Sequence, residues 1–243
     1  MPSSSPHRTR PLVALRALAA LSADPDDLPK VFTIIDSLPG RAPARMLARM
    51  RGSEEGRRLL ASKPDLALRL ADRAALRALP QGTLGRAYAA LMDREGITPQ
   101  GIVDASDLGR ERSPELSEEQ RFIGNRMRDS HDLWHAVTGY GPDLLGEASL
   151  LCFTYAQTKN PGVALVAFLG LMKADSAERR MMWEGYRRGQ RAEWLPAIVW
   201  EELLDRPLEE VRERMRVGPP PVYAPVTTAA LRESGVLSPR AAS

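Results

Sequence analysis

The chain reads SEEQRFIGNRMRDSHDLWHAVT over residues 117–138, and GYGP follows at residues 139–142. Ser117 and Gln120 have the spacing of a capping box, in which each side chain bonds the backbone N–H of the other residue at the start of a helix. Beyond them, apolar residues such as Ile123 recur at helical spacing, so one face of the segment should point inward. Because two glycines and a proline follow, the segment predicts a long helix that ends at the GYGP turn.

The rest of the chain shows the same helical periodicity between turn signals, and no stretch alternates with the period of a β-strand. Helices are expected over residues 11–21, 28–35, 41–60, 66–79, 84–95, 143–158, 163–173, 176–186, 194–204 and 208–217. Residues 97–116 read as loop with at most one short helical turn. We therefore predict an all-α, single-domain bundle of roughly ten helices over residues 11–217. A disordered N-terminus (1–10) and a proline-rich, extended tail (218–243) should flank it.

Composition narrows the classes of protein to which the chain can belong. With 243 residues, 43% of them hydrophobic, it can bury a core without disulfides, and its single cysteine, Cys152, allows none within the chain. The net charge is +3, without the dense basic block typical of nucleic-acid-binding tails, so no nucleic acid partner is expected. The longest uncharged apolar run, residues 162–172, is shorter than the roughly 18 residues that a membrane-spanning helix needs.

The N-terminal segment bears on where the protein acts. Arg16 interrupts the apolar residues 11–21, so a secretory signal is not expected. No acidic residue precedes Asp24, which is typical of a mitochondrial transit peptide and equally of a frayed bacterial N-terminus. We prefer the interpretation as a frayed bacterial N-terminus.

Two of the three histidines lie four residues apart within the predicted long helix. His131 and His135 share one face, where two imidazoles can reach one metal ion. Met127 and Ile123 continue the same row, so this face should point inward, where an unpartnered imidazole is costly. Asp132 lies about 100° further round the helix than His131. It can ligate the ion from that edge or orient a ligand from behind it.

Glu147 follows His135 by twelve residues, too far along one straight helix to reach the same ion. The GYGP turn allows the second helix to fold back and bring Glu147 to the two histidines. A carboxylate in an apolar run also needs a partner, and a cation is one. The alternative is a pair of ordinary helix histidines, with Asp132 paired to Arg128 and Glu147 in water.

These residues resemble a known family. His131-Asp132-Leu-Trp-His135, eleven residues and then Glu147 look like the HDxxH-x11-E signature of the coenzyme Q biosynthesis protein 4 family. The residues LPQGTLGRAY at 79–88 resemble another of its segments. Further similar blocks lie at residues 139–147, 153–157, 160–162, 194 and 200–204, so that the likeness covers roughly residues 28–217.

The resemblance implies an all-helical protein of ubiquinone biosynthesis that is peripheral on the inner membrane. It would lie on the cytoplasmic side in a bacterium and on the matrix side in a mitochondrion. It would help to replace the ring carboxyl of a polyprenylated hydroxybenzoate by hydroxyl, beside other enzymes of the pathway. His131, Asp132, His135 and Glu147 would then be metal ligands and catalytic residues, usually with zinc.

The residues themselves leave the metal and the role open. Two histidines with one or two carboxylates suit zinc, our first expectation, and also suit a ferrous ion with open positions. An enzyme would keep a coordination position open, whereas a lipid-binding scaffold of the biosynthetic complex would have a closed, structural site. A hydrolase is disfavoured, because Asp132 is shorter than the glutamate base of the HExxH proteases.

A polyprenyl substrate needs an apolar groove. The run over residues 162–172 is apolar all round, so it should be buried, as the wall of such a groove or as an ordinary core helix. Trp134, Tyr140 and Tyr155 are candidates to contact an aromatic ring near the metal, although aromatic residues are more often core. Arg128 is a fourth candidate for substrate binding, and a homodimer is the default assembly.

Overall fold

The long helix expected before the GYGP turn is present as α9 (Glu118–Thr138) in the computed structural model, which describes residues 9–96, 101, 104, 106–108 and 116–235. Its capping box is formed: Gln120 N donates to Ser117 Oγ at 3.2 Å, and Ser117 N donates to Gln120 Oε1 at 3.0 Å. Gly139 ends the helix in the left-handed conformation.

The described residues form helices throughout and no β-strand, which confirms the all-α prediction. The helices before α9 are α1 (Pro11–Ala23), α2 (Leu28–Ser37), α3 (Ala42–Gly52), α4 (Glu54–Ser62), α5 (Leu66–Ala71), α6 (Arg73–Ala78) and α7 (Leu84–Glu95). Those after it are α10 (Leu144–Thr158), α11 (Pro161–Lys173), α12 (Ser176–Arg191), the 3-10 turns η1 (Leu195–Ala197) and η2 (Trp200–Glu202), α13 (Leu208–Met215) and α14 (Thr228–Glu233).

Three predicted helices were wrong in extent. The one expected over 41–60 is divided into α3 and α4, because Ser53 accepts a hydrogen bond from Gly56 N at 3.1 Å and starts a new helix. The one expected over 66–79 is divided into α5 and α6 by Asp72, which caps α6 in the same way. The third, over 194–204, consists only of η1 and η2.

The C-terminal tail differs from the prediction of an extended segment. Residues 220–226 carry no regular secondary structure, but α14 follows, because Thr227 Oγ1 accepts a hydrogen bond from Ala230 N. The hydroxyl of Tyr223 donates to Asp143 Oδ2 at 2.6 Å and accepts from Gly141 N at 2.8 Å. The described part of the tail is therefore anchored to the start of α10. The predictions for residues 1–8, for most of the segment 97–116 and for residues 236–243 lie outside the described residues.

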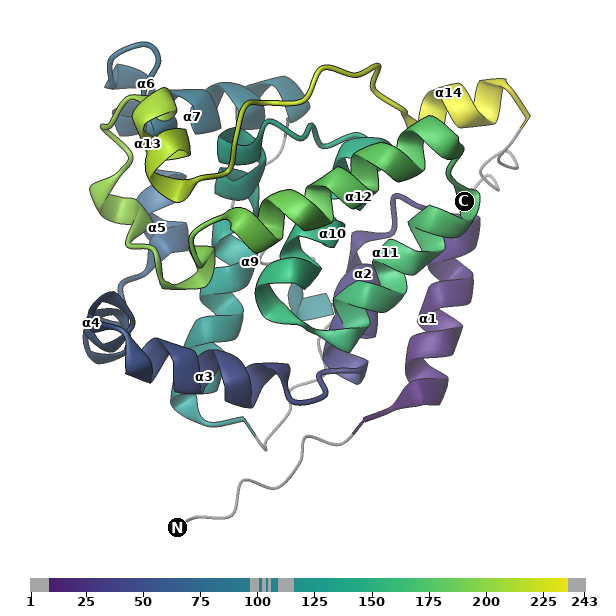
Figure 1. Ribbon diagram of the computed structural model, residues 1–243, viewed down its shortest axis with the longest axis horizontal. Helices are drawn as coiled ribbons and strands as arrows, with labels where there is room; N and C mark the ends of the chain where they lie inside the picture. The colour runs from purple at the N-terminus through teal and green to yellow at the C-terminus, as the bar shows by residue number, and fades with distance from the viewer. Residues whose placement is uncertain (1–8, 97–100, 102–103, 105, 109–115, 236–243) are drawn as a thin grey trace.

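Two groups of helices lie on either side of α9 and α10 (Figure 1). On one side, α5, α6, α7 and α13 pack with α9 around the main apolar core, whose largest buried side chains include Trp134, Trp200, Tyr88 and Phe153. On the other side, α1, α2 and α11 share a smaller cluster around Leu21 and Ile34. The space between the second group and α9 matters for the site described below.

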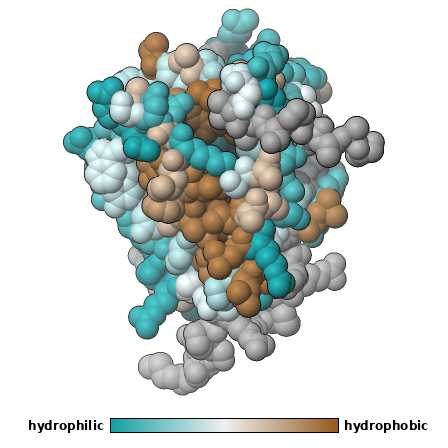
Figure 2. Space-filling model, turned by 90° about the vertical axis from the view of Figure 1, so that its right-hand side faces the viewer, coloured by the Kyte–Doolittle hydropathy of each residue, from teal (hydrophilic) through white to brown (hydrophobic). Residues whose placement is uncertain are grey.

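Helix α11 is buried on only one side. Val163, Val166 and Ala167 are buried, but Phe168 and Met172 are 56% and 63% exposed, so the expectation that this helix is buried all round was wrong. Among the described residues, no helix covers its outer face. Figure 2 shows a hydrophobic area on the face of the molecule where α1 and α11 lie.

Gly139 combines a turn conformation with a close approach. Its φ is +78°, and a Cβ there would lie 2.4 Å from Pro220 Cβ and 2.9 Å from Pro220 Cα. We expect Gly139→Ala to lower the free energy of unfolding by about 1–3 kcal/mol, through left-handed strain and this contact. Urea denaturation of the variant measures the change. Gly124→Ala is the matched control, because a Cβ at this helical glycine of α9 meets nothing within 4 Å. An equal loss in both variants would contradict the prediction.

Candidate metal centre

The turn between α9 and α10 brings Glu147 back over the end of α9. After Gly139, Asp143 caps α10 by accepting hydrogen bonds from Leu145 N at 3.2 Å and Gly146 N at 3.3 Å. Glu147 then lies in the first turn of α10, where a carboxylate is favoured by the helix dipole. The chain therefore folds back as the GYGP turn predicted.

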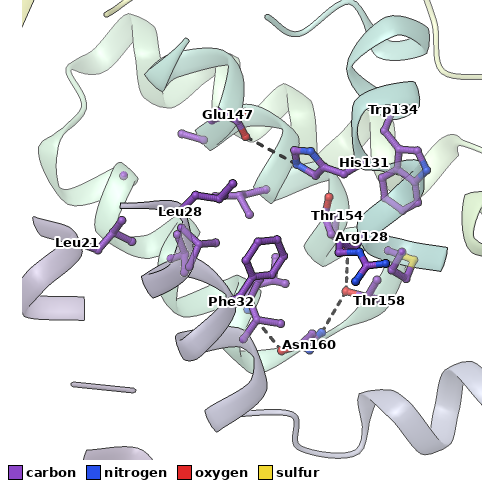
Figure 3. Close-up of a pocket in the computed structure, with 18 of the residues that line it drawn as sticks. Leu21, Leu28, Phe32, Arg128, His131, Trp134, Glu147, Thr154, Thr158 and Asn160 are labelled. Atoms are coloured by element: carbon purple, nitrogen blue, oxygen red, sulfur yellow. Dashed lines mark hydrogen bonds and ion pairs between the residues drawn. The ribbon is translucent and has the colours of Figure 1, made fainter. Parts of the chain in front are cut away.

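The two histidine rings converge on the carboxylate of Glu147. His135 Nε2 lies 3.1 Å from Glu147 Oε1, and His131 Nε2 lies 3.7 Å from Glu147 Oε2. The ring centroids of the two histidines are 4.7 Å apart. Figure 3 shows the side chains of His131 and Glu147 directed toward each other from α9 and α10.

The environment of His135 fixes which ring nitrogen is free. Its Nδ1 lies 2.9 Å from the carbonyl oxygen of Tyr140, and because a carbonyl only accepts, Nδ1 carries the proton. When the imidazole is neutral, Nε2 therefore has a free lone pair. This atom is buried and has no hydrogen bond of acceptable geometry. His135 Nε2 therefore has the properties of a metal ligand: its lone pair is buried, held in one orientation and not used by a hydrogen-bond donor.

Asp132 contacts Nδ1 of His131, as the Tyr140 carbonyl contacts Nδ1 of His135. Asp132 Oδ1 lies 3.3 Å from His131 Nδ1, so it can hold that nitrogen as the donor and leave Nε2 facing Glu147. One ligand atom each from His131, Asp132 and His135 also lie within 4.8 Å of one another. The contact with His131 favours the orienting role for Asp132, while its distance to the cluster also permits ligation.

The charges in the cluster are strongly coupled. Burial lowers the pKa of His135, but Glu147, Asp132 and the Tyr140 carbonyl together outweigh burial and raise this pKa to about 9. Burial raises the pKa of Glu147, but His135 and His131 together outweigh burial and lower this pKa to about 2. Without a metal the two groups form an ion pair at neutral pH. A divalent cation bound here would displace the proton. Two imidazole nitrogens and carboxylate oxygens suit zinc or ferrous iron.

The cluster opens onto a large cavity of about 2040 Å³ between α9 and α10 on one side and α1, α2 and α11 on the other. The side chains of His131 and Glu147 are 35% and 37% exposed, so they are accessible from this space. Figure 3 shows Leu28 and Phe32 of α2 across the cavity from His131. Apolar residues of α1, α2, α10 and α11 make up much of the wall: Leu21, Leu28, Phe32, Leu151, Val163, Val166 and Leu169.

The four candidates for substrate binding have different positions. Arg128 and Trp134 line the cavity, although the Trp134 ring is buried and packs edge-on against Phe153. Tyr140 does not line it, and acts on the site through the carbonyl that orients His135. Tyr155 does not line it either, because its ring stacks on Tyr186.

Two arginines that the sequence did not single out, the buried Arg188 and the partly buried Arg212, hold the end of α9. Arg188 Nη2 donates to Thr138 O at 2.7 Å, and Arg212 donates to Val137 O at 2.9 Å and to Ala136 O at 3.1 Å. They satisfy carbonyls of the last turn of α9, directly after His135. No local signal marks them, since their partners lie 50 to 76 residues away in sequence.

Fold and site together define an all-α protein with a histidine–carboxylate cluster in the wall of a large, mainly apolar cavity. The chain belongs to the family of the coenzyme Q (ubiquinone) biosynthesis protein Coq4, whose family model matches residues 9–221.

Individual relatives agree with this assignment. The chain is 35% identical over 181 residues to the ubiquinone biosynthesis protein coq4, mitochondrial, of Botryotinia fuckeliana, which covers 72% of this chain and 62% of that protein. It is 31% identical over 200 residues to the ubiquinone biosynthesis protein COQ4, mitochondrial, of Pyricularia oryzae, which covers 80% of this chain and 63% of that protein. The chain thus spans somewhat over 60% of the length of these relatives.

A solved structure shares the fold. The crystal structure of a proposed ubiquinone biosynthesis protein from Nostoc punctiforme superposes with a TM-score of 0.66 at 24% sequence identity. The match covers 86% of this chain and 96% of that chain. It shows that the helical arrangement is that of a known structure.

Proposed function

We propose that this protein acts in ubiquinone biosynthesis by metal-dependent oxidative decarboxylation, replacing the ring carboxyl of a polyprenyl-hydroxybenzoate by hydroxyl. The observation that carries the proposal is the opening of the His131–His135–Glu147 cluster onto the large apolar cavity. A closed structural site would have no need of such access. The relatives' names support the pathway, and the cluster supports metal-dependent chemistry in it.

The reaction is a two-electron oxidation of the ring. The aromatic acid and water give the phenol, carbon dioxide, two protons and two electrons, so an electron acceptor is needed. If dioxygen is the oxidant, one of its oxygen atoms becomes the new hydroxyl and the other leaves as water. A two-electron donor is then needed in place of the electron acceptor. A bound divalent ion would supply Lewis acidity to a substrate oxygen. The protein residues would orient the head group, and the cavity would exclude bulk water from it.

The cavity has the chemistry that a prenyl chain requires, because apolar side chains of four helices line it next to the cluster. None of the helices built from described residues is both long and apolar enough to cross a bilayer. Exposed Leu12 and Leu15 on α1, with Phe168 and Met172 on α11, support peripheral contact with the inner membrane. Other enzymes of the pathway and a second copy of the chain are the remaining expected partners.

Conversion of a defined substrate tests the proposed reaction. The purified protein, loaded separately with zinc and with ferrous iron, is incubated with 3-geranyl-4-hydroxybenzoate, dioxygen and a chemical reductant, or with a quinone acceptor. We expect the hydroquinone product by mass spectrometry, with loss of the carboxyl carbon as carbon dioxide. Glu147→Gln should reduce the rate at least about a hundredfold, because a charged group at the metal is lost. Binding of metal and prenyl lipid without any turnover would favour the scaffold instead.

A further inference from the structure

Arg128 is a buried cation in the cavity wall next to the candidate metal centre. It precedes His131 by one turn of α9, which places their Cβ atoms about 5–6 Å apart on the same face. Its side chain is only 8% exposed. Figure 3 shows Arg128 and His131 along the same wall of the pocket.

The protein satisfies only one edge of this guanidinium. Arg128 Nε donates to Asp129 Oδ1 at 2.7 Å, and among the described residues no other hydrogen bond or ion pair to Arg128 is present. The two Nη groups are therefore available to the cavity, with the Asp129 contact holding the group in place. A buried guanidinium with free donors is unfavourable unless a ligand satisfies it.

A second polar group without a partner lines the same space. Thr154 Oγ1, on α10, is buried and has no hydrogen bond. The neighbouring Thr158 differs, because its hydroxyl donates to Thr154 O at 2.8 Å and accepts from Asn160 N at 3.3 Å. The wall thus carries donors without a protein acceptor from Arg128 and Thr154 beside the cluster.

We propose that Arg128 is the positioning residue that binds the carboxylate of the aromatic acid, which leaves the phenol oxygen for the His131–His135–Glu147 cluster. This inference rests on the proposed function. A guanidinium forms two parallel hydrogen bonds with a carboxylate, the geometry that two free Nη groups offer. Arg128 and His131 are three residues apart, a rise of about 4.5 Å along α9, which is comparable to the width of one benzene ring. The head group would therefore span the two sites with its carboxyl carbon at a fixed place.

Binding of two ligands that differ only in charge tests this role. Zinc-loaded full-length protein is titrated calorimetrically with 3-geranyl-4-hydroxybenzoate and with the neutral 3-geranyl-4-hydroxybenzamide. The wild type should bind the acid roughly ten- to hundredfold more tightly than the amide. Arg128→Met should remove this preference while changing amide affinity less than about threefold, and Arg128→Lys should restore part of it, since an ammonium is a point charge.

Arg121→Met is the matched control, because Arg121 is an exposed arginine of the same helix that also lines the cavity. It should keep the preference for the acid. Thermal unfolding of each variant establishes that it is folded. If Arg128→Met is not folded, the acid-over-amide preference of Arg128→Lys is compared with the wild type instead.

Three outcomes would overturn the inference. Equal losses of affinity for acid and amide in Arg128→Met would make Arg128 a merely structural residue. Arginine-dependent binding of geranyl phosphate, without preference for acid over amide, would assign it to a phosphate. If the wild type binds neither the acid nor the amide, the proposed function itself is contradicted. This outcome differs from the first two because it is seen with the wild type alone.

Discussion

His135→Ala is expected to reduce the bound metal from near one ion per chain to background. His135 is almost fully buried, its Nδ1 is committed to the Tyr140 carbonyl, and its Nε2 faces Glu147 without a hydrogen bond. Alanine removes this nitrogen and cannot replace it, and loss of one of about three ligands should lower the affinity at least about a hundredfold. Elemental analysis by mass spectrometry after reconstitution with zinc or ferrous iron measures the change, beside the His131→Ala, His135→Ala double variant.

His7→Ala is the matched control, since His7 is the third histidine of the chain and lies outside the family match. It should keep the full complement of metal. Asp132→Asn separates the two roles of that residue. If Asp132 only orients His131, affinity should fall about 10- to 100-fold and the stoichiometry should remain near one. Retention of stoichiometric metal by the double variant would place the ion elsewhere and remove the basis of the proposed site.

The geometry of this site was largely predictable because its parts are close in sequence. His131 and His135 share a helix face by periodicity alone, and the GYGP turn makes the return of Glu147 the natural outcome. The capping box at Ser117 and Gln120 formed as its spacing requires. Local hydrogen bonds and helical periods are properties of short segments, so they are readable without knowing the rest of the fold.

Features that depend on distant contacts were not predictable. The division of helices at Ser53 and Asp72 is the local exception: each cap joins residues only three apart, but it competes with a periodicity that also suits an unbroken helix. Phe168 and Met172 are exposed because no helix in the described part of the chain lies over that side of α11, which composition does not reveal. Tyr155 was expected near the metal, but its stacking on Tyr186 depends on how α12 packs against α10. The same holds for Arg188, whose partners come from two other segments.

Arg188→Met is expected to lower the free energy of unfolding by about 3 kcal/mol, the largest effect on stability among the variants proposed for this chain. Arg188 Nε donates to Val217 O at 2.7 Å and Nη2 donates to Thr138 O at 2.7 Å, and both bonds are buried. Methionine keeps much of the volume but donates nothing, so two buried carbonyls lose their donor, at about 1–3 kcal/mol each. The favourable charge at the C-terminus of α9 is lost as well.

Arg187→Met provides the matched control. This neighbouring residue of α12 is 55% exposed, and its one ion pair among the described residues is with Glu184, at 3.9 Å, so its loss should change stability by less than about 0.5 kcal/mol. Urea denaturation of the metal-free proteins compares the two variants directly. A loss in Arg188→Met no larger than in Arg187→Met would show that the link between α12, the chain after α13 and the end of α9 contributes little.

The Arg188 variant also reports on how the fold supports the site. Thr138 follows His135 by three residues, so loosening the last turn of α9 should disturb the imidazole without removing it. We therefore expect Arg188→Met to bind metal more weakly than Arg187→Met and more tightly than His135→Ala. Because ligand binding stabilises a folded protein in proportion to the logarithm of ligand concentration over Kd, excess metal should restore part of the lost stability in Arg188→Met. It should restore less in His135→Ala, since that variant has lost one of the metal ligands and its Kd is higher.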